Sequence, residues 1–147
     1  MLNTDVELKY LETHMNTVAN KQLLQDIYAG ISRGDLQPLL DSMADDIQWS
    51  IIGSTAVSGT SRGKQEVIDK LLKPVRARLA PGPIVFQPER FIAEGEYVVM
   101  QAHGRATALS GKPYNNTYCI VCRIVDGKVK EMVDYVDTEL ITSALGA

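Results

Sequence analysis

The sequence has few of the residues that cross-link small proteins or hold metals. Its 147 residues include only two cysteines and two histidines. Two cysteines do not make a disulfide framework, and a chain of this length can bury about 68–70% of its unfolded surface, so its core needs no such supports. With 45% hydrophobic residues, the chain is also too apolar for intrinsic disorder. We therefore expect an ordinary globular domain.

Long apolar runs and an excess of positive charge are missing as well. No segment approaches the ~18 consecutive apolar residues of a membrane span, and residues 1–14 lack the apolar stretch of a secretory signal. Lysine and arginine number 15 against 18 acidic residues, which gives a formal charge of −3 without a basic cluster. Nucleic acid and membranes are therefore not expected as partners, and small molecules are. We expect a cytoplasmic location.

Motifs for cofactors and metals are not found either. The sequence has no glycine-rich phosphate loop, no His-Glu-x-x-His and no Gly-x-Ser-x-Gly. Cys119 and Cys122 have the spacing of a C-x-x-C motif, but they fall within a predicted strand, with their side chains on opposite faces. Zinc would need two further ligands that the chain does not supply. No cofactor and no metal are predicted.

The first half of the chain is predicted to be mainly helical. Residues 1–14 are expected to form a loose or partly helical extension, and residues 15–147 a single domain. Apolar residues at helical spacing predict one helix that ends at Arg33-Gly34 and a second over residues 36–43, capped by Asp35. Alternation predicts a strand over residues 47–51. A loop over residues 53–63 then precedes a third helix over residues 67–79, which Pro74 should kink or split.

The second half is predicted to consist of strands joined by tight turns. The strands cover residues 84–93, 97–109, 114–125 and 128–136, and Asp126-Gly127 is a typical two-residue hairpin turn. Asp137-Thr138 can cap a short last helix. Helices followed by an antiparallel meander predict an α+β fold, in which a cone-shaped, curved antiparallel sheet is covered on one face by the N-terminal helices. Such a cone encloses a pocket.

Three passages carry a resemblance to a known superfamily. They are Ser32-Arg33-Gly34-Asp35, the segment from Met43 to Trp49, and the segment from Ile124 to Tyr135 with its Val-Asp-Gly-Lys turn. Over residues 19–145 the chain resembles the nuclear transport factor 2-like (cystatin-like) superfamily, and within it the SnoaL-like polyketide cyclases, with limonene epoxide hydrolase and ketosteroid isomerase as relatives. The resemblance implies the fold and the pocket. It does not choose among isomerases, cyclases, hydrolases and binding-only members.

The resemblance also implies which functional positions are lost and which is kept. The general base of ketosteroid isomerase falls on Ile51 and its oxyanion-holding acid on Ile120, so that mechanism is not expected. The water-positioning tyrosine and asparagine of limonene epoxide hydrolase fall on Trp49 and Ile51, and its Arg-x-Asp becomes Gln101-Ala102-His103. The acid of the last strand is kept as Asp134, which is also the acid/base position of SnoaL-type cyclases.

Asp134 and His103 are the candidate catalytic residues. Alternation places Asp134 with Lys130, Met132 and Val136 on the face predicted to line the pocket, where desolvation would favour the neutral acid and suit it to proton transfer. His103 could exchange protons with it. The structural alternatives are a solvent-facing or lysine-paired aspartate and an ordinary strand histidine.

Eight further residues are expected to bind substrate. Tyr118 could donate a hydrogen bond to a substrate oxygen, Gln101 could orient the ligand, and aromatic and apolar side chains would form the wall. The predicted substrate-binding residues are Trp49, Tyr28, Gln101, Tyr118, Asn116, Met132, Ile51 and Ile120.

These residues support one leading hypothesis and two alternatives. The leading one is a cofactor-independent acid/base enzyme, an isomerase, cyclase or epoxide-hydrolase-like protein, acting on a small apolar, oxygenated molecule of polyketide or terpenoid type. The alternatives are a carrier of a hydrophobic ligand and a structural dimerisation module. A homodimer is expected through the outer face of the sheet, because helices cover only one side. The residues assigned to that face are Val98, Met100, Val121, Arg123, Val133 and Tyr135.

Overall fold

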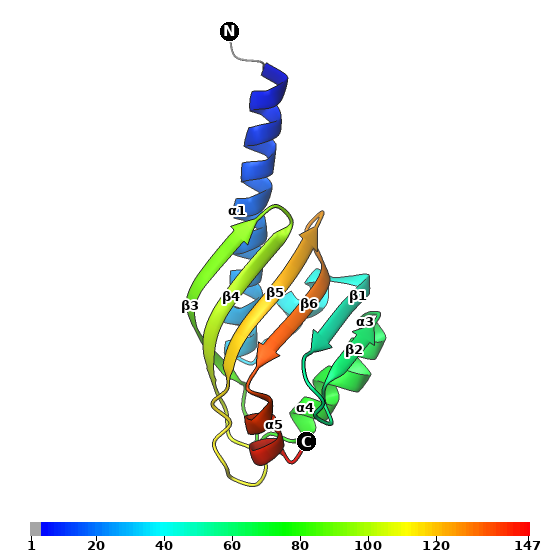
Figure 1. Ribbon diagram of the computed structural model, residues 1–147, viewed down its shortest axis with the longest axis vertical. Helices are drawn as coiled ribbons and strands as arrows, with labels where there is room; N and C mark the ends of the chain where they lie inside the picture. Colours follow the sequence, from blue (N-terminus) through cyan, green and yellow to red (C-terminus); the bar gives the residue numbers. More distant parts are fainter. Residues whose placement is uncertain (1–3) are drawn as a thin grey trace.

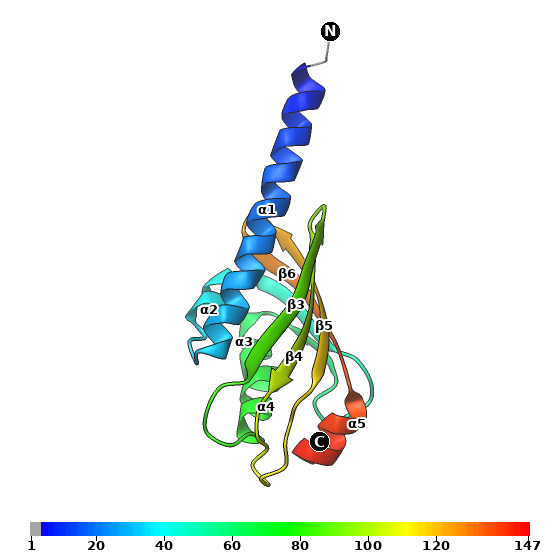
Figure 2. The same cartoon turned by 90° about the vertical axis from the view of Figure 1, so that its left-hand side faces the viewer.

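The structure is a computed structural model that describes residues 4–147, in which helices lie on one face of a curved six-stranded sheet (Figures 1 and 2). The helices are α1 (Thr4–Ser32), α2 (Gln37–Ser42), α3 (Lys64–Val67), α4 (Lys73–Ala77) and α5 (Thr138–Leu145). The strands are β1 (Met43–Ile51), β2 (Gly59–Arg62), β3 (Val85–Glu94), β4 (Tyr97–Arg105), β5 (Thr117–Val125) and β6 (Lys128–Val136). The predicted α+β class is confirmed.

The sheet has the strand order β2-β1-β6-β5-β4-β3. Strands β3 to β6 form the predicted antiparallel meander, and the hairpin at Asp126-Gly127 has positive φ at both residues, 50° and 72°. The first strand, β1, pairs in parallel with the last, β6, so that Trp49 lies opposite Met132 and Ile51 opposite Asp134. This pairing brings together strands that are far apart in the sequence.

One strand lies inside a segment predicted to be a loop. Strand β2 lies within residues 53–63 and pairs with β1. Its sequence, Gly-Thr-Ser-Arg, has no apolar alternation that could indicate a strand. It forms an edge of the sheet, where the Thr60 and Ser50 hydroxyls lie 2.7 Å apart. Two predicted strands are shorter than expected, because β4 ends at Arg105 and β5 begins at Thr117.

The third predicted helix is interrupted, but not by a simple kink at Pro74. A π-helical turn, Ile68–Leu72, separates α3 from α4, and the Lys73 amide bonds to the Ile68 carbonyl five residues earlier. Pro74 follows at the start of α4. Proline has no amide hydrogen to donate one turn back, and the widened turn before it accommodates that loss.

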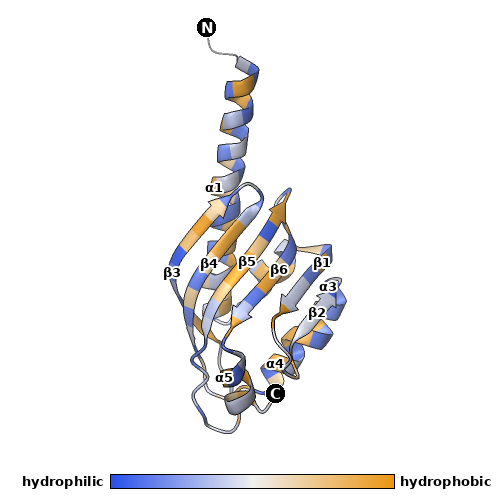
Figure 3. Cartoon of the chain, in the orientation of Figure 1, coloured by the Kyte–Doolittle hydropathy of each residue, from blue (hydrophilic) through white to orange (hydrophobic). Residues whose placement is uncertain are grey.

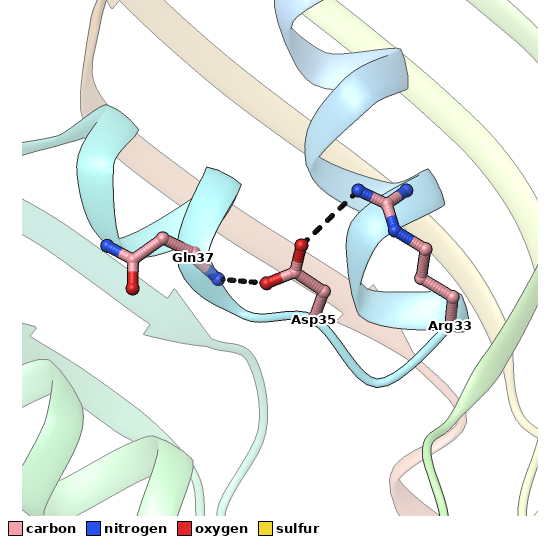
Figure 4. A network of polar contacts seen from close by, with 3 residues as sticks. All are labelled: Arg33, Asp35 and Gln37. Atoms are coloured by element: carbon pink, nitrogen blue, oxygen red, sulfur yellow. Dashed lines mark hydrogen bonds and ion pairs between the residues drawn. The ribbon is translucent and has the colours of Figure 1, made fainter.

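The link between α1 and α2 is fixed by Asp35 (Figure 4). Its carboxylate accepts a hydrogen bond of 3.0 Å from the Gln37 amide and forms an ion pair of 3.4 Å with Arg33. The N-cap position of α2 is Leu36, which makes no side-chain cap bond, so Asp35 fixes the turn one residue before the predicted cap. The predicted cap of α5 is confirmed, because Asp137 accepts a bond of 3.1 Å from the Leu140 amide.

Helix α1 is longer than its apolar pattern indicates. It begins at Thr4, so residues 4–14 of the predicted extension continue the helix, while residues 1–3 lie outside the described part. Figures 1 and 2 show the N-terminal part of α1 projecting beyond the sheet. Every residue from 4 to 16 is exposed.

The core lies between the sheet and the helices. Leu24 and Ile27 of α1 pack there with Ile47 of β1, and all three are fully buried. Figure 3 shows how apolar and polar residues alternate along the strands. Within residues 4–147, no helix has both the length and the apolar composition needed to cross a membrane.

Candidate functional site

A cavity of about 420 Å³ lies between the inner face of the sheet and the helices. Its wall is almost entirely apolar and takes side chains from α1, α2, α4, α5 and most of the strands. This volume is in the range of small-molecule sites. The wall includes Ile31, Leu39, Ile51, Leu71, Val75, Leu79, Ile120, Val136 and Ile141.

Asp134 is the carboxylate in this wall. Alternation along β6 turns Asp134 inward with Met132, and the parallel pairing places Trp49 of β1 beside it. The Trp49 indole Nε1 donates a hydrogen bond of 3.0 Å to Asp134 Oδ1. Burial raises the pKa of Asp134 to about 7, and the bond from Trp49 opposes that rise. The group can therefore take up or release a proton near neutral pH.

Three tyrosines line the same cavity as Asp134. They are Tyr28 of α1, Tyr118 of β5 and Tyr114, which precedes β5. Burial raises the pKa of all three phenols, and the nearby charge of Asp134 adds to the rise. The phenols therefore remain protonated at neutral pH and can donate hydrogen bonds to a ligand oxygen.

An aromatic row positions two of these phenols. The ring of Phe86 lies between Tyr28 and Tyr118, with centroid distances of 4.8 and 4.9 Å. Gly104 on β4 leaves space for the Tyr118 ring, because a Cβ atom there would lie 2.6 Å from its Cε2 atom. The row joins α1, β3 and β5 into one wall of the cavity.

The structure brings together six of the predicted site residues at the cavity. Asp134 and the predicted wall residues Trp49, Tyr28, Tyr118, Ile51 and Ile120 all line it. Asn116 and Met132 are fully buried outside the lining. The side-chain amide of Asn116 donates hydrogen bonds of 3.2 Å to the Tyr114 hydroxyl and 3.1 Å to the Asp137 carbonyl. It therefore holds Tyr114 in position without lining the cavity itself.

His103 and Gln101 are not at the cavity, and the predicted pairing of His103 with Asp134 is wrong. Along β4, Val98, Met100, Ala102 and Gly104 point inward, which turns the alternate residues to the outer face. The His103 side chain is 56% exposed, and its Nε2 atom contacts the Glu89 carboxylate. Gln101 lies with it on the outer face, beside Cys119.

Three further predicted placements are also corrected. Val98 and Met100, predicted on the outer face, are fully buried on the inner one. Lys130, predicted to share a face with Asp134, instead binds Asp46 at 2.8 Å. A β-bulge between Arg123 and Ile124 shifts the pairing with β6, so that Val129 is buried in place of Lys130.

Several wall residues could not be assigned from the sequence. Tyr114 lies in the irregular segment before β5. Phe86 belongs to β3, and no residue of that strand indicated in the sequence which of its faces points inward. Arg76 brings a cation to the wall, and its guanidinium donates to the carbonyls of Ala80 and Gly82. Across residues 4–147, no group of three or more His, Cys, Asp or Glu side chains could hold a metal ion.

Comparisons with known proteins agree with this architecture. A family model described as a SnoaL-like domain matches residues 24–132. An NTF2-like protein of unknown function from Burkholderia pseudomallei is 26% identical, with a TM-score of 0.79 over 88% of this chain and 98% of that one. An NTF2-like protein from Burkholderia xenovorans is 27% identical, with a TM-score of 0.72 over 88% and 97%.

A third similar structure contains a ligand. TerC, co-crystallised with polyporic acid, is 26% identical, with a TM-score of 0.75 over 88% of this chain and 99% of TerC. The search of curated proteins finds no match.

Proposed function

Because the chain belongs to the SnoaL-like domain family, we propose that it is a small-molecule enzyme in which Asp134 transfers a proton to or from an apolar, oxygenated substrate. Isomerisation, aldol-type cyclisation and hydrolytic ring opening all require such a transfer. The observation that carries the proposal is a carboxyl group with a pKa of about 7 in the wall of an apolar cavity.

Trp49 supports this role by fixing the carboxyl group. Its bond of 3.0 Å occupies Oδ1, and we assign the proton transfer to Oδ2. The bond also keeps the pKa of Asp134 lower than burial alone would make it. Trp49 is thus a positioning residue that holds the carboxyl group in place and limits the rise of its pKa.

The neutral phenols supply the other half of the chemistry. Removing a proton next to a carbonyl leaves negative charge on oxygen, and a fixed hydrogen-bond donor stabilises that charge best where water is excluded. Tyr118 and Tyr28 are both protonated and line the cavity. We assign one of them to the substrate oxygen. The co-crystal of TerC with polyporic acid supports a small organic molecule as the ligand of this cavity.

The proposal is tested by hydrogen–deuterium exchange, which follows the transferred proton directly whatever the final product is. A panel of apolar enolisable ketones is incubated with the protein in D₂O, and exchange is followed by NMR. We expect catalysed exchange of at least one ketone, with a rate that rises with pH through about 7 as Asp134 ionises. His103→Gln should leave that rate unchanged. Exchange that is pH-independent or needs His103 would contradict the proposal.

Replacement of Trp49 by phenylalanine tests the positioning role. The variant keeps an aromatic ring but loses the donor to Asp134. Because that bond lowers the pKa of the carboxyl group, we expect the midpoint of the pH–exchange profile to move to higher pH. A variant that only loses packing would lower the rate at every pH without moving the midpoint.

A carrier function is the second candidate, and one observation favours it. Ile51 and Ile120, at positions that bear carboxyl groups in ketosteroid isomerase, both line the cavity. One experiment distinguishes a carrier from an enzyme. Ligands that change Trp49 fluorescence and raise the melting temperature without exchange in D₂O would favour the carrier.

We also propose that the outer face of the sheet is a homodimer interface. A row of apolar residues crosses four strands there, since Ile92 pairs with Val99, Val99 with Val121 and Val121 with Val133. In Figures 1 and 2, none of the described helices covers this face. An isologous dimer would bring the two rows together.

The interface is tested at the centre of the row. Val121→Lys would place a charge against the partner, so we expect loss of the corresponding association step in sedimentation equilibrium at micromolar concentration. Leu109→Lys, in an exposed loop away from the row, is the matched control. Unchanged association in the Val121 variant would refute this interface.

A further inference from the structure

The projecting part of α1 has an apolar stripe with no partner within the described chain. Its members are Leu8, Leu11, Met15 and Val18, and these residues are 63%, 52%, 67% and 55% exposed. We call these four residues the seam. Their spacing of three, four and three is that of the a and d positions of a coiled coil. The projecting helix in Figures 1 and 2 therefore carries a helix-pairing surface.

The seam points away from the body of the protein. At 3.6 residues per turn, it lies on the opposite side of α1 from Leu24, Ile27 and Tyr28, which are buried against the sheet. Gln22 continues the same stripe toward the body and is also exposed. A second helix can lie along the seam without meeting the domain.

The isolated arm is a poor helix by itself. An isolated helix shorter than about 12–15 residues is marginal in water, because its nucleation is costly. Here packing of the C-terminal half of α1 supplies the nucleus, but a solvated arm gains little from its exposed apolar side chains. Pairing would bury them at no further nucleation cost. We infer that the seam binds the seam of a second copy of this chain in an antiparallel helix pair.

Charge decides between the two orientations. Glu7 and Lys21 flank the seam on the same side, because both occupy g positions, two heptads apart, when Leu8 is an a position. In an antiparallel pair Leu8 lies opposite Val18 of the second copy, and Glu7 faces Lys21 twice. In a parallel pair Glu7 would face Glu12 twice, and these two repulsions would cancel the two contacts of Lys21 with Asp26 beyond the seam. The antiparallel pair has one repulsive contact, between Glu12 and Glu12 of the second copy, and two attractive contacts between Glu7 and Lys21.

Self-association of the full-length chain tests the seam. We expect Leu11→Glu combined with Met15→Glu to weaken one association step by on the order of 100-fold or more in sedimentation equilibrium, because charges would be buried at the centre of the pair. The control is Val6→Glu with Tyr10→Glu, which changes two exposed apolar residues of the same arm outside the seam. This control should associate as the wild type does.

The proposed sheet interface is unchanged in both variants, so its association step persists in each. Circular dichroism shows whether the domain remains folded. A wild-type chain without a seam-dependent step, or equal weakening in the control, would overturn the inference.

Charge reversal tests the orientation separately. In the antiparallel pair, Glu7→Lys should weaken association, and adding Lys21→Glu should restore it. In a parallel pair, Glu7→Lys would strengthen association by facing Glu12. Strengthening by this single substitution would therefore overturn the antiparallel arrangement.

Discussion

Asparagine in place of Asp134 is expected to lower turnover by on the order of 10²–10⁴-fold while leaving ligand binding within a few-fold of the wild type. The amide has the shape of the carboxyl group, and its oxygen can still accept the bond that Trp49 donates at 3.0 Å. The amide does not titrate near neutral pH, so it cannot act as the general acid or base. The measurement pairs exchange or product formation with the fluorescence of Trp49, the single tryptophan of the chain.

The matched control is Asp46→Asn on β1. Asp46 is exposed and does not line the cavity. Its bond to Lys130 holds its pKa below the ordinary value. Turnover of the control should equal that of the wild type. Full activity in the Asp134 variant would remove the carboxyl group from the mechanism, whereas loss of both binding and turnover would point to a structural role.

Asp134→Asn is also expected to be more stable than the wild type at neutral and alkaline pH. The pKa of Asp134 is raised by burial from an ordinary 3.8 to about 7 in the folded chain. Between these values the folded state holds a proton that the unfolded state has lost. The free energy of unfolding therefore falls as pH rises through this window and is flat above it. The total loss attributable to Asp134 is about 4 kcal/mol by linkage at 1.36 kcal/mol per pKa unit.

Urea unfolding of both proteins from pH 4 to pH 8 measures this effect as a difference. The free energy of unfolding of Asp134→Asn minus that of the wild type should grow steadily up to about pH 7. For Asp46→Asn the difference should stay nearly constant over this range, because the pKa of Asp46 is lowered from 3.8 and its contribution to stability is lost only as pH falls below that value. A pH-independent difference for Asp134 would mean that the carboxyl group is not desolvated.

The lower turnover and the higher stability expected for Asp134→Asn mean that the carboxyl group gives activity at the expense of stability. An ionised carboxylate without a cationic partner is costly in an apolar cavity. The wild type keeps it, and asparagine would be the more stable choice at neutral pH. Such a cost is typical of functional groups in enzymes.

The sequence was sufficient for those parts of the fold that local chemistry determines. Asp137 and the Asp126-Gly127 turn act on their immediate neighbours and have their predicted roles, and Asp35 binds the Gln37 amide from one residue before the N-cap. The alternation around Trp49 and Asp134 likewise indicated their inward faces, because each strand buries one side. These features do not depend on distant contacts.

The failures have a common physical origin in contacts that alternation alone does not determine. On β4, the small residues Ala102 and Gly104 occupy the inner face because the Tyr118 ring fills the space against them. That leaves His103 outside. On β6, a bulge moves Lys130 from the inner phase to the surface. Both depend on cross-strand neighbours that a single strand's pattern does not reveal.

The parallel pairing of β1 with β6 has a consequence for folding. Trp49 and Asp134 are 85 residues apart in sequence, and their bond forms only when the last strand has inserted between β1 and β5. The chain must therefore close a long loop before its reactive group is in place, and such non-local contacts are slow to form. The meander of β3 to β6 and the helices can assemble from nearby segments, whereas the reactive centre also needs the long-range pairing of β1 with β6. We therefore expect chemical competence to appear only when β1 and β6 have paired, and a change in Trp49 fluorescence during refolding would time that step.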